Sequence, residues 1–528
     1  MGKVKFNKFK SIVPDFNDTS RGPVSGVKLV LGYLGVLLII TGIIILIPLV
    51  MYIFYPEESA STFYAFLIPG LATIAVGFLL TLFIYKKKKN RLAHHEDIVL
   101  VLAYWIMTIL VGAIPFMFLE DFGHDFLKCV YESTSGFTTT GYTVITDYST
   151  IPHVFLFYRA IMLLFGGVGL ILILNSALSD KFNMKLYNAD GHSDMLLPNI
   201  VKSARLILAI YLFYIAIGSL VMFGVGQIGD IKINFFDSVC YTISCLSLGG
   251  FSNCAESIGY YNSVGIECVC CVLMVLGTTN FLIHLHLLRG RYKNGINHNE
   301  TKLVLLCLLI IGPLASIIGY YVPNAVFQNQ IQANFGNTFR VSYFTYVSSF
   351  TTCGLSNFSV INIADPAAFG VPFEIICCLG MAVGGMAGST AGGLKMSRFI
   401  ILAKGTANNY HDHFTDKRKV NVHFTYRFGK KEEITDELYK QTVMYSFIYF
   451  TVIFISSFIM TFFGLTFLES VYNSIGSISN SGLGFISANS HPAVLIISIV
   501  VMIAGRIEIV PIISLFAIAR NIIYKKEF

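Results

Sequence analysis

Four short polar segments, each with a glycine near its end, lie between long apolar stretches of this sequence. The segments are Ser133–Tyr142, Ser244–Asn253, Ser348–Asn357 and Ser477–Phe485. Their residues are mostly small and carry hydroxyl or amide groups, so the chemistry they offer is mainly that of backbone carbonyl oxygens. Their spacing along the chain is nearly constant, which indicates an internal repeat.

Backbone carbonyls are tolerated at membrane depth only where protein buries them or where they line a water-filled cavity. Four such loops around one axis would form a ring of oxygens that can replace the hydration shell of an alkali cation. Glycine is required where a side chain would restrict the backbone or crowd the ion path. The sequence aligns Gly141, Gly249, Gly354 and Gly482. The predicted filter comprises Thr139, Thr140, Gly141, Leu248, Gly249, Cys353, Gly354, Ser481 and Gly482.

A second interpretation of the four segments is that they are re-entrant loops with a purely structural role. Composition fits either interpretation, because both require a membrane protein. Hydrophobic residues make up 55% of the 528 residues and charged residues 13%, and the mean hydropathy is +0.69. The net charge of +7 arises from Lys and Arg in alternate loops, which is typical of cytoplasmic loops and argues against nucleic-acid binding. The 11 cysteines lie mostly in apolar runs, so we expect buried thiols and no transition-metal site.

The elements that must position these loops are membrane spans, each needing about 20 apolar residues. Spans are predicted at 29–54, 62–85, 98–119, 152–177, 204–226, 262–288, 302–321, 371–383, 439–463 and 493–521. Short helices are predicted before the polar loops, at 125–137, 235–246 and 338–350. Glu132, Asp237 and Glu469 are expected at or near the starts of such helices, where carboxylates cap helix N-termini or attract cations.

The predicted fold class is an all-α polytopic membrane protein. Four pseudo-repeated helix–pore loop–helix units surround a central ion pore, with two extra N-terminal transmembrane helices. The predicted divisions are 1–96, 97–200, 201–300, 301–437 and 438–528. An even number of spans places both termini in the cytoplasm. The third unit also contains a charged insertion, 408–436, in which Val420, Val422, Phe424 and Tyr426 alternate and predict a hairpin turning near Gly429.

A glycine-rich run, Gly384–Gly393, interrupts the last apolar helix of the third unit. A break at membrane depth must be satisfied by protein or by a cavity, so we expect the run to face the pore as a gate. Arg506 and Glu508 lie within an apolar stretch, where a charge needs partners. Arg506 either holds carbonyls of this run or pairs with Glu508, and Lys395 and Arg398 either anchor the helix or couple the gate to a partner. The predicted gate residues are Gly384, Gly385, Gly388, Ser389, Thr390, Gly392, Gly393, Lys395 and Arg506.

Seven motifs in order resemble the Trk/Ktr/HKT superfamily of potassium transporters, and its TrkH branch in particular. They are Ser135–Gly141, Gly249–Ser252, Arg159 with Gly166–Gly169, Leu186–Asp190 with Pro198, Asn280–Phe281 with His284 and Leu288–Gly290, Gly384–Lys395, and Gly505–Glu508. The resemblance covers about residues 25–524. The chain departs from the family at Leu248 and Cys353, which stand where Thr is usual or frequent, and at Ser481–Leu483, which replaces a common Gly-Pro.

The resemblance implies potassium uptake across the cell membrane by a homodimer. It also implies a separate, cytoplasmic, TrkA-like nucleotide-binding regulatory subunit. This chain contains neither a GxGxxG nor a GxxxxGK[ST] loop, so no cofactor is expected in it. The insertion 408–436 and the basic loops 181–202 and 289–302 are the predicted docking surface.

Two other functions remain open at this point. A symporter would move sodium or protons together with potassium, and the departures at Leu248 and Cys353 are compatible with it. An intramembrane enzyme would need paired carboxylates or a Ser/His pair facing each other within the spans. No such pair occurs at helical spacing, so the sequence favours a transporter that is not an enzyme.

The resemblance generates one prediction at the first aligned glycine. Plant relatives that pass sodium carry Ser at this position, so Gly141→Ser should admit sodium. Reversal potentials measured in mixed sodium and potassium solutions test this. A reversal potential unchanged from the parent chain would show that Gly141 does not set selectivity.

Overall fold

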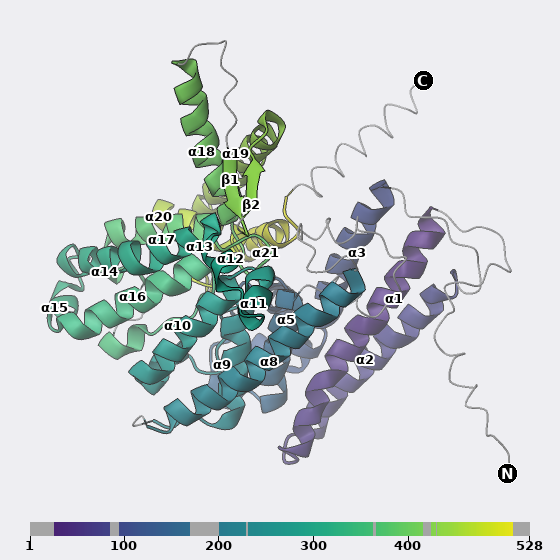
Figure 1. Ribbon diagram of the computed structural model, residues 1–528. Helices are drawn as coiled ribbons and strands as arrows, with labels where there is room; N and C mark the ends of the chain where they lie inside the picture. Colours follow the sequence, from purple (N-terminus) through teal and green to yellow (C-terminus); the bar gives the residue numbers. More distant parts are fainter. Residues whose placement is uncertain are drawn as a thin grey trace.

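The computed structural model describes residues 26–84, 94–168, 200–228, 231–362, 366–414, 424–428 and 430–509. Several predictions concern residues outside these ranges: the linker Leu186–Asp190, the residues Gly169, Val420, Val422 and Gly429, and both chain termini. The described chain is helical apart from one two-stranded hairpin (Figure 1).

The N-terminal pair of helices forms an antiparallel hairpin beside the rest of the molecule (Figure 1). Helix α1, Val27–Leu46, continues as a 3-10 helix, Ile47–Ile53, and α2 spans Ala60–Thr81. A β-carbon on Gly35 would lie 2.6 Å from the carbonyl oxygen of Gly77, so the two backbones touch. Small residues permit such close helix packing within a membrane.

Four units follow, each with a first helix, a short pore helix and a second helix. The first helices are α3 His94–Ala113, α8 Ile200–Gly226, the segment α13 Asn299–Leu306 to α14 Gly312–Tyr321 with a π-helical turn at Cys307–Ile311, and α19 Asp436–Thr461. The pore helices are α4 Phe126–Phe137, α9 Phe235–Ser247, α16 Phe335–Thr351 and α20 Phe467–Ile478. The second helices are α5 His153–Val168, α10 Val264–Thr278, α17 Val371–Val383 and α21 Pro492–Arg506.

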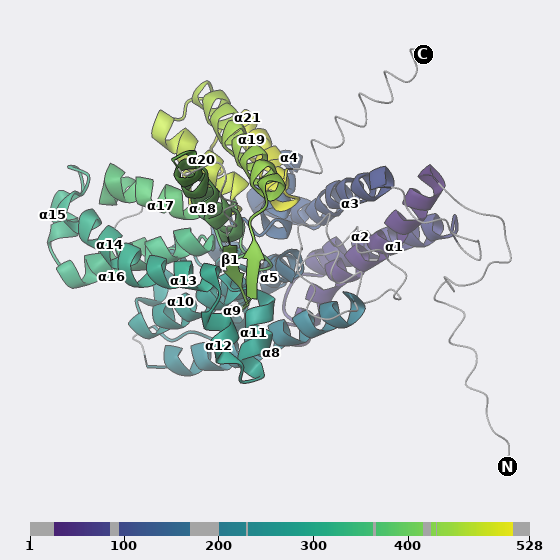
Figure 2. The same ribbon diagram turned by 45° about the horizontal axis from the view of Figure 1, so that its top comes forward.

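Contacts between the units form a closed cycle. Within each unit the pore helix packs against both longer helices. Between units, each second helix packs against the pore helix of the next unit: α5 on α9, α10 on α16, α17 on α20 and α21 on α4. Figure 2 shows α21 of the last unit beside α4 of the first. The fold is therefore an all-α membrane architecture with a pseudo-fourfold centre.

Six helical segments of the described chain are long and apolar enough to cross a membrane, and the bent pair α10–α11 would make a seventh. The predicted span 262–288 is wrong as a single helix. After α10 the chain turns by 107° into α11, Phe281–Leu288. Asn280 caps α11 by accepting a hydrogen bond from the N–H of Leu282 at 2.7 Å, which stabilises the bend.

The predicted last span, 493–521, is also wrong at its midpoint, because α21 ends at Arg506 and Glu508 has a φ of +55°. Helix α17 likewise ends at Val383, and helicity resumes in α18, Met396–His413. We call the intervening residues, Gly384–Lys395, the gate loop. Second helices of three units therefore stop within the molecule, as the sequence predicted for the third unit alone.

The predicted hairpin is present as strands β1, Phe424–Arg427, and β2, Lys430–Glu433. The strands pair antiparallel, with Arg427 opposite Lys430. The hairpin and α18 lie together and project from the helical bundle (Figure 1). Short elements complete the chain: α12 Tyr292–Ile296, α15 Gln328–Gln332, and 3-10 helices at Pro115–Phe118, Glu120–Phe122, Tyr148–Thr150, Ser257–Tyr261, Phe358–Ile361 and Pro366–Phe369.

The three carboxylates expected at pore-helix starts behave differently. Glu469 forms a capping box with Thr466 at the start of α20, and Asp237 lies in the first turn of α9. Glu132 does not cap a helix, because α4 is capped by Asp125 and Glu132 lies beyond its midpoint. Its side chain is fully buried and is used in the site described next.

Candidate ion filter and gate loop

Each pore helix is followed by a residue with left-handed backbone. The φ angles are +55° at Thr139, +57° at Leu248, +60° at Thr352 and +52° at Asn480. The next N–H donates to the carbonyl five residues back, at 2.8 to 3.0 Å in every loop: Thr140 to Ser135, Gly249 to Ser244, Cys353 to Ser348 and Ser481 to Gly476. This helix-ending pattern turns the chain sharply into the loop. The four loops therefore start in the same way.

These hydrogen bonds correct the predicted alignment of the second loop with the other three. Counted from the left-handed residue, the equivalent glycines are Gly141, Gly250, Gly354 and Gly482. The sequence aligned Gly249 with the other three, and that alignment is wrong by one residue. Gly249 is instead equivalent to Thr140, Cys353 and Ser481. Two adjacent glycines permit either alignment, and only the hydrogen-bonded register distinguishes them.

Backbone meets backbone where the first three loops adjoin. A β-carbon on Gly141 would lie 2.3 Å from the carbonyl oxygen of Gly249. One on Gly250 would lie 2.2 Å from the carbonyl oxygen of Cys353. Real β-carbons do not approach other atoms this closely, so these positions accept only glycine without movement of the backbone.

The fourth loop closes the circle. A β-carbon on Gly354 would lie 2.5 Å from the amide nitrogen of Gly482. One on Gly482 would lie 2.6 Å from the carbonyl oxygen of Thr140, back in the first loop. All nine residues predicted for the filter thus belong to one ring of four touching backbone segments.

A buried ion pair ties the first two loops together. Glu132 accepts hydrogen bonds from the hydroxyl of Thr143 at 3.0 Å and from the N–H of Val144 at 3.1 Å. Arg159 donates through Nε to Glu132 at 2.9 Å and through Nη1 to the carbonyl of Ser252 at 2.7 Å. The two side chains are 0% and 1% exposed. The pair therefore holds the segments that follow the first and second filter loops against each other.

The second and fourth units also brace their loops with pore-helix side chains, which are partly exposed or neutral. In the fourth unit, Asn473 accepts from the N–H of Phe485 at 2.7 Å. In the second, the carboxylate of Asp237 accepts from Asn253 at 2.7 Å and from the hydroxyl of Tyr261 at 2.9 Å. Pore-helix side chains thus hold the segment that follows the ring glycine in these two units, Gly250 and Gly482.

Glycines of the second helices pack against the ends of the pore helices, and we call this end of the ring its base. In three units a β-carbon on such a glycine would lie 2.1 to 2.5 Å from the carbonyl oxygen at the end of a pore helix: Gly166 on Phe137, Gly277 on Leu246 and Gly505 on Ile478. In the third unit a β-carbon on Gly380 would lie 3.4 Å from the α-carbon of Phe350, which is an ordinary contact distance. The second helix of the third unit therefore lies farther from its pore helix at this position than the other three do.

The gate loop is hydrogen-bonded to the break between α10 and α11. Two of its N–H groups donate to the end of α10, and two of its carbonyls accept from the start of α11. The bonds are Met386 to Thr278 at 3.2 Å, Thr390 to Gly277 at 3.3 Å, Phe281 to Gly388 at 3.2 Å and the Asn280 amide to Ala387 at 2.5 Å. Two breaks in neighbouring units thus satisfy each other's backbone.

The gate loop also lies directly against the base of the ring. The hydroxyl of Thr390 donates to the carbonyl of Leu246 at 3.0 Å, and the N–H of Gly392 donates to the hydroxyl of Thr352 at 3.0 Å. A β-carbon on Gly392 would lie 1.8 Å from the carbonyl oxygen of Ser479. The remaining predicted gate residues, Gly384, Gly385, Gly388, Ser389 and Gly393, form the turns of the loop, one of which is closed by Ser389 donating to Met386 at 2.6 Å.

Arg506 joins the gate loop to the ring. Its Nη1 donates to the carbonyl of Thr390 and to the hydroxyl of Thr139, each at 3.3 Å. Its Nη2 donates to the carbonyls of Gly166 and Gly167. Of the two roles that the sequence left open, the geometry favours contact with gate-loop carbonyls.

Glu508 instead pairs with Arg398, at 2.5 Å, and Arg398 also lies over the ring of Tyr445 at 4.0 Å. Lys395 donates to the carbonyl of Ala391 and so closes the end of the gate loop. A cavity of about 40 Å³ lies between the gate loop, Arg506 and Glu508. The charged residues that line this cavity are Lys395, Arg506 and Glu508.

Residues 64–522 match the TrkH family, described as cation transport proteins. The chain belongs to the TrkH family. It is 29% identical over 492 residues to an uncharacterised cation transporter of Methanocaldococcus jannaschii, covering 92% of this chain and 95% of that protein. It is 29% identical over 516 residues to the Trk system potassium uptake protein TrkG of Escherichia coli K12, covering 93% and 98%.

The fold of this chain also resembles that of a solved transporter structure. The crystal structure of the potassium transporter TrkH from Vibrio parahaemolyticus matches with a TM-score of 0.77 at 21% identity, over 92% of this chain and 98% of that one. Because the chain belongs to a family of cation transport proteins and has several helices apolar enough to span a membrane, it is a multi-pass membrane transporter and not an enzyme.

Sequence reasoning missed the use of Glu132 and the anchoring of the gate loop by Asn280. Both had a signal, since a polar or charged residue in an apolar helix needs a partner. Neither partner could be named from local pattern, because Arg159 lies on another helix, 27 residues from Glu132, and Ala387 lies 107 residues from Asn280.

Glu132→Gln should weaken the outer part of the ring. The change leaves Arg159 buried without its counter-charge, which typically costs about 3 kcal/mol. We expect a lower thermal midpoint of the purified protein in detergent. Glu120→Gln, at an exposed carboxylate of the same unit, is the matched control. Equal midpoints for the two variants would show that the buried pair does not hold the ring.

Proposed function

We propose that this chain takes up potassium across the cell membrane through the ring of four loops. The observation that carries the proposal is the closed circle of backbone contacts from Gly141 through Gly250 and Gly354 to Gly482. Rings of backbone carbonyls replace the water around an alkali cation. The family is one of cation transport proteins, and the related TrkG is named a potassium uptake protein.

The gate loop closes this path in our proposal. It presses on the base of the ring through Thr390 and Gly392, and Arg506 holds it there. A guanidinium beside the path repels cations, and its four donated hydrogen bonds keep it in place. Opening requires these bonds to break together and the loop to move aside.

The membrane potential supplies the driving force in this account. About 2.3 kcal/mol per charge at 100 mV corresponds to roughly fifty-fold accumulation of a monovalent cation. A passive pore of this kind needs no catalytic residue.

The assembly that we propose is a homodimer with a cytoplasmic, TrkA-like regulatory subunit. The projecting hairpin β1–β2 and α18 supply the docking surface, with the basic loop 289–302 beside it (Figure 1). The unit boundaries at 97, 201, 301 and 438, and cytoplasmic placement of both termini, complete the arrangement.

Rubidium tracer uptake into liposomes that contain the purified protein tests the proposed function. An internal potassium gradient drives uptake, and external sodium or potassium competes. We expect potassium, and not sodium, to block the uptake. Equal block by both ions would contradict a potassium filter.

Arg506→Ala should raise rubidium uptake, because it removes the charge and the hydrogen bonds that hold the gate loop. Loss of several charge-assisted bonds predicts at least a roughly tenfold increase. Arg506→Lys, which retains the charge but not the fork of donors, should lie between the two. Uptake unchanged in Arg506→Ala would remove Arg506 from the gate.

A further inference from the structure

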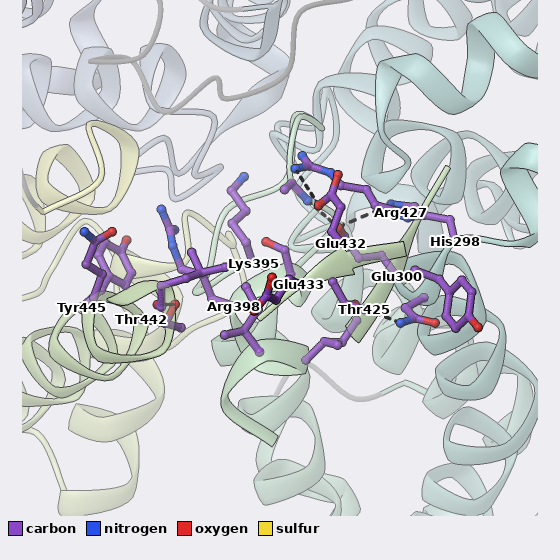
Figure 3. A pocket seen from close by; sticks show the side chains of 18 of the residues that line it. His298, Glu300, Lys395, Arg398, Thr425, Arg427, Glu432, Glu433, Thr442 and Tyr445 are labelled. Carbon is purple, nitrogen blue, oxygen red and sulfur yellow. Dashed lines mark hydrogen bonds and ion pairs between the residues drawn. The ribbon is translucent and has the colours of Figure 1, made fainter. Parts of the chain in front are cut away.

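A cavity of about 720 Å³ lies between the gate loop and the projecting hairpin. Its walls come from the start of α13, from α18, from the hairpin and from α19 (Figure 3). Both Glu300 and His298 line it, as does Ala387 of the gate loop. Residues of the hairpin and of the gate loop thus line one cavity.

Glu300 connects one wall of this cavity to the gate loop. Its Oε2 accepts a hydrogen bond from the N–H of Ala387 at 2.8 Å. The residue is 4% exposed and lies in the first turn of α13. A buried carboxylate gains much of its stabilisation from such bonds, so this contact is stronger than one between neutral groups. The other hydrogen bonds of the gate loop given above join it to backbone, hydroxyl or amide groups or to Arg506, whereas here the acceptor is a carboxylate.

His298 connects Glu300 to the hairpin. Its Nε2 lies 3.4 Å from Oε1 of Glu300, within ion-pair distance although not aligned as a hydrogen bond. The ring is stacked on Phe428, with centroids 4.6 Å apart and planes 17° from parallel. His298 is 1% exposed, so the Phe428 ring forms part of its cover.

The hairpin holds Phe428 in this position through its own geometry. Phe428 follows β1 in the hairpin turn, with a φ of +47°. The side-chain oxygen of Asn299, which lies between His298 and Glu300, accepts hydrogen bonds from the hydroxyl of Thr425 and the N–H of Tyr426 in β1, each at 3.0 Å. A shift of the hairpin therefore moves Phe428 relative to His298.

We infer that Glu300 is a positioning residue for the gate loop, and that Phe428 and His298 link the position of the hairpin to it. Withdrawal of Phe428 admits water to His298 and Glu300, which weakens the bond to Ala387 and frees the gate loop. This inference rests on the proposed function, since it concerns the same gate. It adds a route from the cytoplasmic hairpin to the gate loop through three side chains.

Hydrogen exchange of the gate-loop peptide, measured on the full-length protein in liposomes, tests the link directly. We expect Glu300→Ala to raise exchange at residues 384–395 roughly tenfold, the factor that one charge-assisted bond supplies. Glu300→Gln retains an acceptor and should have a smaller effect. Phe428→Ala should act in the same direction, and the double variant should add little to Glu300→Ala, because both act through one contact. Glu433→Gln, at an exposed carboxylate on the same cavity wall, is the matched control.

Rubidium uptake by the same variants provides the second readout, and it should rise in the same order. Exchange in Glu300→Ala equal to that of Glu433→Gln would overturn the inference. Additive effects of Glu300→Ala and Phe428→Ala would overturn the route through His298. If Glu300→Ala fails to fold, Glu300→Gln and Phe428→Ala decide the matter alone. Coupled exchange without potassium-selective uptake by the parent chain would retain the link and reject the proposed function.

Discussion

Contact between backbones around the central ring is the constraint on which the rest of this structure depends. At Gly141, Gly250, Gly354 and Gly482 a β-carbon would lie within 2.6 Å of an atom of the neighbouring loop. Four chain segments can meet this closely only if each arrives with the same geometry. The left-handed residue and the returning hydrogen bond after each pore helix provide that geometry. The helices around the ring serve to deliver these four turns to one place.

Close backbone packing also distinguishes the third unit from the other three. In the first, second and fourth units a glycine of the second helix packs on a pore-helix carbonyl, whereas in the third unit the corresponding approach is looser and the second helix is interrupted by the gate loop. The freed backbone groups of the gate loop are satisfied by the break in α10–α11, by Thr352 and by Arg506. Non-helical backbone at membrane depth is tolerated only with such partners. The gate loop is thus a break in one unit whose backbone groups are satisfied by the neighbouring units.

Most helices of the fold could be predicted from local patterns in the sequence. Apolar length and polar loops predicted the units, and the helix predicted at 235–246 is α9, Phe235–Ser247. The run of glycines from Gly384 marked the gate loop because glycine disfavours helix. Contacts between distant residues could not be predicted from local patterns. The adjacent glycines Gly249 and Gly250 permitted two alignments of the second loop. The bend at Asn280 depends on Ala387, which belongs to another unit. The role of Glu132 likewise depends on Arg159, which its own helix does not contain.

The central claim is that the ring of loops holds a dehydrated alkali cation. Anomalous diffraction from crystals grown in rubidium measures this directly. The account predicts rubidium density on the axis, surrounded by carbonyl oxygens of the segments at Thr140, Gly249, Cys353 and Ser481. Replacement of rubidium by sodium should remove that density. Rubidium found only outside the ring, or sodium equally ordered within it, would contradict the claim.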